Sequence, residues 1–201
     1  MKIIVVGASG TIGRAVAAAL SERHEVVPVS HSKGDLRVDL ASRDSIARLF
    51  DAVGPFDAVV SAAGRAAFKP LADLGDEEFG LSLLNKLMGQ VNLVREGLSR
   101  IRRGGSFTLT SGVLAREPMP GSAAISLVNA GLEGFAAAAA LEMPPGTRIN
   151  VVSPPWVSET LAAMGRDPSA GMPAAQVARA YVESVQGGDT GRVIDARAFR
   201  T

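Results

Sequence analysis

Three glycines near the start of the chain have the spacing of a phosphate-binding loop. Gly7, Gly10 and Gly13 follow an apolar run at residues 3–6 and lead into a helical pattern that begins at Thr11. In such a strand, turn and helix, the first glycine permits a tight turn and the second lets backbone N–H groups approach a pyrophosphate. The third lets the helix pack closely on the strand. The helix N-terminus adds partial positive charge and free donors for an anion. The pattern predicts a dinucleotide-binding loop whose candidate residues are Gly7, Ser9, Gly10, Thr11, Ile12 and Gly13.

The segment after the second apolar run bears on which dinucleotide binds. An acid at the end of that strand would hydrogen-bond the ribose 2'-hydroxyl of NAD and repel the 2'-phosphate of NADP. Hydroxyls and potential cations stand there instead, and the nearest acid, Asp35, is expected to lie past the site. These residues favour NADP(H), with NAD(H) as the alternative. The candidates are Arg14, Ser30, His31 and Ser32, the last three of which could also be ordinary turn residues.

Composition excludes several other classes of protein. The 201 residues are 47% hydrophobic, enough for one substantial core, and the formal net charge of +1 gives no field that would favour nucleic acid or an anionic membrane as partner. With no cysteine and only two histidines, at positions 24 and 31, no metal site is expected. No apolar stretch reaches the roughly 20 residues that cross a bilayer, and a cytoplasmic location is the default expectation.

Short apolar runs rich in β-branched residues alternate with longer helical patterns along the whole chain. This alternation is typical of a parallel sheet covered by helices on both faces. Strands are predicted at residues 3–6, 25–30, 35–39, 58–61, 106–110, 148–152 and 192–194. Helices are predicted at residues 11–21, 43–53 with Ser42 as cap, 77–100 with an early break at Gly80, 123–141 and 173–185. The predicted fold is a single α/β domain over residues 1–201, a doubly wound Rossmann sheet in three αβα layers.

Residues 154–173 differ from the rest of the chain. They contain four prolines and two glycines, which predicts a loop with little regular structure. The loop leaves the strand at 148–152 from its carboxyl end, the edge at which open α/β sheets bind ligands. It is a candidate lid over a site, and an idle surface connection is the alternative.

Several motifs occur in an order and spacing that resemble the short-chain dehydrogenase/reductase family over almost the whole chain. Besides the glycine loop, these are Asp39-Leu40, Ser61-Ala62-Ala63-Gly64, the segment 148–154 and the segment 190–194. The resemblance implies that Asp39 and Leu40 contact adenine, that Ala62, Ala63 and Gly64 line the cofactor, and that Val157 contacts the nicotinamide amide. It also implies a homodimer or homotetramer formed through the helices at 77–100 and 123–141.

The family transfers a hydride between nicotinamide and a carbonyl or alcohol. A tyrosine acts as acid or base, a lysine four residues later lowers its pKa, a serine holds the substrate oxygen, and an asparagine supports a proton relay. Ser111 matches the serine, but Ile125 and Asn129 stand at the tyrosine and lysine positions and cannot titrate. Lys86 stands at the asparagine position, with Asn85 beside it. The tetrad implied by the resemblance is therefore degenerate.

Two functions are compatible with this pattern. The first is an NADP-dependent oxidoreductase acting on a small carbonyl or alcohol, in which Ser111 orients the substrate oxygen. Lys86, desolvated beside Ser111, takes the place of the tyrosine by losing a proton near neutral pH or by polarising a carbonyl. Lys86 could instead be a surface lysine or bind nicotinamide-ribose hydroxyls. The second is a non-catalytic NADP-binding sensor or scaffold, which Ile125 and Asn129 favour. Isomerisation or elimination on the same fold is a third possibility. The sole tyrosine, Tyr181, is expected to be a packing residue.

Overall fold

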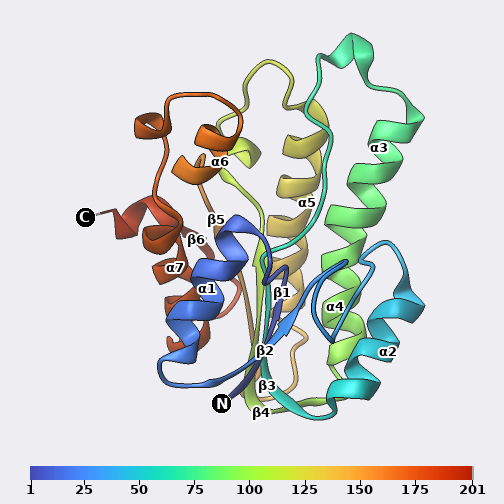
Figure 1. Ribbon diagram of the computed structural model, residues 1–201. Coiled ribbons are helices and arrows are strands. Elements are labelled where there is room, and N and C mark those ends of the chain that lie inside the picture. Colours follow the sequence, from blue (N-terminus) through green and yellow to red (C-terminus); the bar gives the residue numbers. More distant parts are fainter. Residues whose placement is uncertain (201) are drawn as a thin grey trace.

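Six parallel strands form the central sheet of the computed structural model, which describes residues 1–200 (Figure 1). Their order is β2-β1-β3-β4-β5-β6. The strands are β1 Lys2–Val6, β2 Glu25–Val29, β3 Phe56–Ser61, β4 Ile101–Thr110, β5 Arg148–Ser153 and β6 Val193–Asp195. The helices are α1 Thr11–Ser21, α2 Arg43–Val53, α3 Asp76–Ser82, α4 Gly89–Gly97, α5 Ala123–Ala139, α6 Ser158–Ala163 and α7 Ala174–Gln186.

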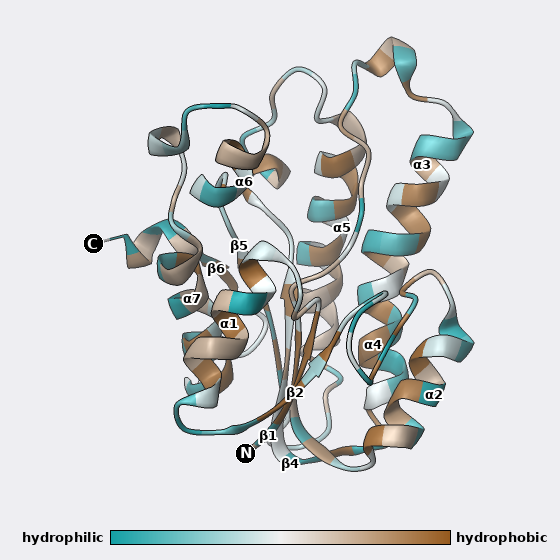
Figure 2. Ribbon diagram, viewed as in Figure 1, coloured by the Kyte–Doolittle hydropathy of each residue, from teal (hydrophilic) through white to brown (hydrophobic). Residues whose placement is uncertain are grey.

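Alternation along the strands divides the hydrophobic core between two helical layers. On β1, Ile4 and Val6 belong to the core shared with α2, α4 and α5, whereas Ile3 and Val5 belong to the core shared with α1 and α7. Strand side chains point to opposite faces in turn, so an unbroken apolar run is what a strand covered on both faces requires. Figure 1 shows the two layers, and in Figure 2 the strands between them are mostly hydrophobic.

The doubly wound α/β domain predicted from the sequence is confirmed. Local signals set several boundaries: α1 spans residues 11–21 as expected, and the Ser42 side chain accepts a hydrogen bond from Ser45 N at the start of α2. No helix between residues 1 and 200 is both long and apolar enough to span a membrane. Within the same residues, no three histidine or acidic side chains lie close enough together to hold a metal ion.

Residues 35–39 do not form the predicted strand. Arg37 makes a single bridge to Ser30, next to β2 at the edge of the sheet. Gly34, with φ +76°, turns the chain, and after it Val38 and Leu40 are buried in the core while Asp39 is exposed. Buried and exposed residues therefore alternate in this segment as predicted, but the buried ones anchor a loop to the core and do not belong to a strand.

Two further expectations are corrected. The run predicted as a helix at 77–100 does not break at Gly80; it passes from α3 into a π-helical segment, Leu83–Met88, and on into α4. A glycine costs a helix only about 1 kcal/mol relative to alanine, less than tertiary packing supplies. The proline-rich segment 154–173 holds α6 and a 3-10 turn at Pro168–Ala170, because its prolines stand at element boundaries.

Candidate cofactor and substrate site

The glycine loop has the geometry that its spacing predicts. Gly7 has φ +88°, and its N–H and that of Ala8 both donate to Val29 O, at 2.8 and 3.0 Å. A Cβ on Gly13 would lie 2.0 Å from Gly7 O, so α1 approaches the loop too closely for any side chain there. Gly10 caps α1 without a side-chain hydrogen bond. The first backbone donors of α1 are therefore available to an anion.

This loop lies at the point where the sheet changes its direction of growth. The chain goes from β1 to β2 on one side and returns to β3 on the other, which places the crevice at the carboxyl ends of β1 and β3. There Ala62 N donates to Val6 O at 2.8 Å, and a Cβ on Gly7 would lie 2.6 Å from Ala62 O. Ala62 and Ala63 thus border the glycine loop, whereas Gly64 lies against Lys86.

A hollow lies beside the loop at the end of β2. Its polar lining residues are Ser9, Ser30, Lys33 and Asp35, and the rest of its lining is Ala8, Pro28, Gly34 and Leu36. The serines and Lys33 suit a phosphate, but Asp35 lies at this hollow and not past the site as the sequence suggested.

The remaining predicted contacts of the nucleotide are placed less directly. Arg14 is exposed on the first turn of α1, and His31 and Ser32 are exposed in the loop that follows the hollow. Asp39 is exposed and its Oδ1 accepts from Ala41 N, whereas the side chain of Leu40 is buried in the core against Gly89. Of these, Leu40 is the least available to a ligand.

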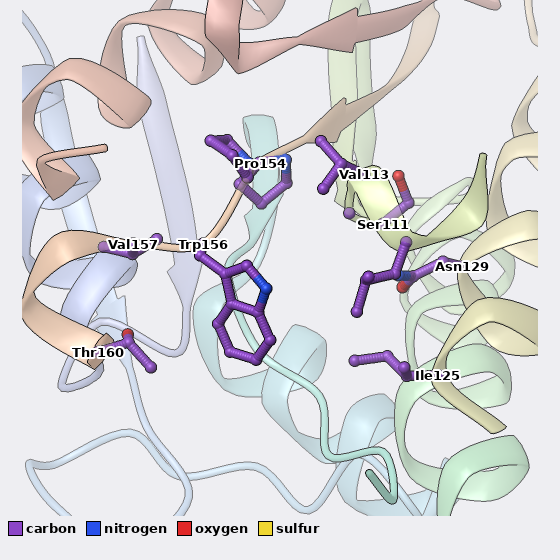
Figure 3. Close-up of a pocket in the computed structure, with 11 residues that line it drawn as sticks. Ser111, Val113, Ile125, Asn129, Pro154, Trp156, Val157 and Thr160 are labelled. Carbon is purple, nitrogen blue, oxygen red and sulfur yellow. The ribbon is translucent and has the colours of Figure 1, made fainter. Parts of the chain in front are cut away.

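A pocket of about 150 Å³ opens at the carboxyl ends of β4 and β5. The three positions matched to the family's serine, tyrosine and lysine, Ser111, Ile125 and Asn129, all line it. Its other lining residues are mostly apolar: Gly112, Val113, Leu114, Pro154, Pro155, Trp156, Val157 and Thr160. Figure 3 shows the Trp156 ring between Val157 and Thr160 on one side and Ser111, Ile125 and Asn129 on the other.

Aromatic and backbone contacts fasten the segment above this pocket. Trp156 packs edge to face on Phe68, with ring centroids 5.9 Å apart, and the guanidinium of Arg166 lies 6.0 Å from the Trp156 ring. Glu159 in α6 accepts from Ala174 N, and Arg200 donates to Gly171 O at 2.7 Å. Figure 1 shows α6 and the loops before α3 and α5 rising beyond the same end of the sheet.

Ser111 is held by a carboxylate. Its backbone N donates to Val152 O at 3.0 Å, which fixes the end of β4 against β5. Its Oγ donates to Glu133 Oε1 at 2.9 Å, and the same carboxylate pairs with Arg116 at 3.4 Å. Ser111 is buried, and the Glu133 side chain is 14% exposed. The pair therefore connects the pocket to the solvent boundary.

Lys86 lies behind the pocket and does not line it. Its stem packs against Gly64, and its Nζ donates to Ser111 O at 3.4 Å. Burial lowers the pKa of Lys86 to about 8, because the low-dielectric surroundings disfavour the ammonium. Its place in the π-helical segment fits the frequent use of such segments at functional sites.

The side-chain oxygen of Asn129 is a polar atom of the pocket that a bound molecule could hydrogen-bond. It is 1% exposed, and within residues 1–200 its Oδ1 has no hydrogen-bond partner. An unpaired buried acceptor costs about 1–3 kcal/mol, so a donor from a bound molecule would relieve it. Tyr181, by contrast, is fully buried between α7 and the sheet and bonds Thr110 at 2.7 Å, with its pKa raised by burial.

Sequence reasoning missed Glu133, Trp156 and Thr160 as residues of the site. Glu133 could have been found, because it stands four residues after Asn129 and so shares a face of α5. The sole tryptophan, directly after two prolines in the candidate lid, was a second available signal.

A parallel sheet with a glycine-rich loop at its switch point and a pocket beside it defines a dinucleotide-binding domain of the doubly wound type. The sequence matches, over residues 3–195, the family model described as enoyl-(acyl carrier protein) reductase. The chain belongs to the short-chain dehydrogenase/reductase family.

Curated relatives of the chain are reductases. Versicolorin reductase of Emericella nidulans is 28% identical over 131 residues, 54% of this chain and 50% of that protein. The 1-cyclohexenylcarbonyl-CoA reductase of Streptomyces collinus is 26% identical over 174 residues, 75% of this chain and 62% of that protein. The chain thus spans about half to three fifths of the length of these relatives.

Solved structures match the chain over nearly their whole length. The protein lin1944 from Listeria innocua has a TM-score of 0.93 and 41% identity, over 97% of this chain and 98% of that one. A small-chain dehydrogenase in complex with NADPH has a TM-score of 0.86 and 27% identity, over 99% of this chain and 98% of that one.

Proposed function

We propose that this protein is an NADPH-dependent oxidoreductase that acts on a small, largely apolar carbonyl compound or alcohol through an altered active site. The observation that carries the proposal is the pocket at the ends of β4 and β5, where Ser111, Ile125 and Asn129 meet beside the cofactor crevice. An apolar cavity of roughly 150 Å³ accommodates a molecule the size of benzene. The substrate part that enters is therefore small and uncharged.

The residues of the crevice fit a phosphorylated dinucleotide. The start of α1, where the cap Gly10 supplies no side-chain hydrogen bond, suits the pyrophosphate. Ser9, Ser30 and Lys33 suit a 2'-phosphate, with the Lys33 ammonium offsetting the carboxylate of Asp35 in the same hollow. NADPH held there would supply the hydride. The NADPH complex of a 27% identical relative supports the same choice of nucleotide.

Each polar residue of the pocket has a distinct task in this proposal. Ser111 hydrogen-bonds the substrate oxygen, and the unpaired Oδ1 of Asn129 accepts a donor from the bound cofactor or substrate. Lys86 assists by holding the Ser111 carbonyl from behind, since it is screened from the pocket itself. Trp156 covers the opening and excludes water.

A non-catalytic NADPH sensor is the second candidate, and Ile125 is the observation that favours it. A missing general acid typically costs about 100- to 10,000-fold in rate. Such a protein would bind NADPH and change the segment around α6 without turnover.

Nucleotide binding followed by a substrate panel separates the two candidates. Titration of the pure protein with NADPH and NADH should show tighter binding of NADPH, and absorbance at the nicotinamide band should then change with small carbonyls or alcohols. Lys86→Met should lower turnover, because the Ser111 carbonyl loses the hydrogen bond that Lys86 donates. Tight NADPH binding with no turnover on any panel member would leave the sensor, and binding of neither nucleotide would remove both candidates.

A further inference from the structure

The hydroxyl of Ser111 is directed at a carboxylate. Its proton is committed to Glu133 Oε1 at 2.9 Å, in a pocket where Ile125 stands at the position matched to the family's tyrosine. A serine hydroxyl has one proton to donate and two lone pairs that accept. With the proton committed, the remaining capacity of Ser111 Oγ is to accept a hydrogen bond from a ligand.

Glu133 is placed to pass a proton onward. It lies one helical turn after Asn129 on α5, it is 14% exposed, and its Oε2 pairs with Arg116, whose side chain is 51% exposed. The carboxylate thus contacts the pocket serine through Oε1 and the half-exposed Arg116 through both oxygens, since Arg116 Nη2 also donates to Oε1 at 3.5 Å. Serine, carboxylate and surface arginine form a continuous path over residues that lie far apart in the sequence.

We infer that Ser111 and Glu133 form a proton relay that accepts the proton of an alcohol substrate, in place of the family's tyrosine and lysine. The inference rests on the proposed function. In the step, the alcohol O–H bond breaks and its proton goes to Ser111 Oγ, while the Ser111 proton goes to Glu133. The C–H hydrogen leaves with its electron pair for the oxidised nicotinamide, and a C=O double bond forms. Water then removes the proton from Glu133.

The resting hydrogen bond makes the two directions of reaction unequal. With Glu133 ionised, the relay can accept a proton but has none to give, so oxidation of the alcohol is ready to proceed. Reduction of the carbonyl needs a protonated Glu133 first.

The charged groups around Glu133 leave its carboxylate as the acceptor of this relay. Arg116, from the loop after β4, pairs with both oxygens of Glu133 and also faces Asp195, while Lys86, from the π-helical segment, donates to the Ser111 carbonyl and not to the carboxylate. Neither cation stands between Ser111 Oγ and Glu133.

Glu133→Gln tests the relay, because glutamine keeps an oxygen that accepts from Ser111 but cannot take a proton. With NADP⁺ and an alcohol that the wild-type protein oxidises, we expect kcat to fall about 100-fold or more, with little change in KM. Glu142→Gln, just beyond α5 and exposed, is the matched control and should behave as wild type.

A second readout needs neither nucleotide nor turnover. Infrared difference spectra of ¹³C-glutamate-labelled protein follow the Glu133 carboxylate, which is identified by its absence from Glu133→Gln. Ser111→Ala should shift the frequency of this band, because the carboxylate loses the hydrogen bond that Ser111 Oγ donates.

An unchanged kcat in Glu133→Gln, or an unmoved infrared band in Ser111→Ala, overturns the relay and leaves the proposed function standing. A wild-type protein that binds the nucleotide but turns over no alcohol and no carbonyl compound overturns the proposed function and the relay's catalytic role with it. The infrared result then shows whether the pair itself exists, so the two failures are distinct.

Discussion

At the scale of single residues, Lys86 is the side chain whose burial is most costly to the fold. Within residues 1–200 its ammonium has a single hydrogen-bond acceptor, the Ser111 carbonyl, and burial lowers its pKa from 10.5 to about 8. A base whose folded-state pKa is depressed destabilises the protein wherever it is charged in both states, which here means below about pH 8. Because the burial of Lys86 is unfavourable for stability, we expect this side chain to have a role at the site.

Lys86→Met should therefore stabilise the protein at pH 7, by about 2 kcal/mol as an order of magnitude. Between about pH 8 and 10.5 the folded wild-type protein loses its proton before the unfolded chain does, so the advantage of the variant should shrink as pH rises through this range. Urea unfolding at several pH values measures the difference. The control is Lys69→Met, which removes an exposed lysine paired with Glu78 and should change little. Equal stability of the Lys86 variant and wild type at pH 7 would contradict the prediction.

At the scale of elements, the junction of β1 and α1 joins stability to nucleotide binding. The carbonyl of Gly7 lies where a Cβ of residue 13 would be, so the helix start and the phosphate loop can keep their geometry only with glycine at that position. The same closeness aligns the first donors of α1 with the crevice between β1 and β3.

Gly13→Ala should weaken NADPH binding at least tenfold and lower the free energy of unfolding by about 1–3 kcal/mol, because the helix must move away from the loop. Calorimetric titration and thermal unfolding measure the two effects. Gly134→Ala is a matched control in α5, where an added Cβ meets no atom within 4 Å, and it should leave binding unchanged. Wild-type affinity in the Gly13 variant would show that the nucleotide does not use the start of α1.

At the scale of the whole molecule, two exposed leucines lie on the helical layer expected to form an oligomer. Leu84 is 58% exposed in the π-helical segment and Leu127 is 50% exposed on α5. Apolar side chains exposed on the two helices that the family resemblance implicates would be covered in an assembly of copies.

We expect the wild-type protein to sediment as a dimer or tetramer, and Leu127→Glu to shift it toward monomer, since a charge would be buried in the interface. Leu141→Glu, at a site 88% exposed just beyond α5, is the control and should not change the assembly. Sedimentation velocity of the three proteins over a range of concentrations makes the comparison. A monomeric wild type would argue against the assembly.

The sequence by itself determined the features that depend on neighbours along the chain. The glycine loop, the cap at Ser42 and the alternation of apolar strands with helices are local, because a few adjacent residues set the backbone angles and the buried faces. These signals were enough for the fold and for the geometry of the glycine loop. They failed at residues 35–39, where an alternating pattern anchors a loop, since a strand needs a partner and alternation alone does not supply one.

Only the tertiary structure decided which residues of the site contact one another. Ser111 bonds Glu133 across 22 positions, Lys86 reaches the Ser111 carbonyl across 25, and Trp156 packs on Phe68 from another loop. Such contacts arise because parallel strands bring their carboxyl ends to one edge, whatever the distance between them along the chain. Burial, which shifts the pKa of Lys86 and leaves Asn129 Oδ1 without a partner, is likewise a property of the packed molecule.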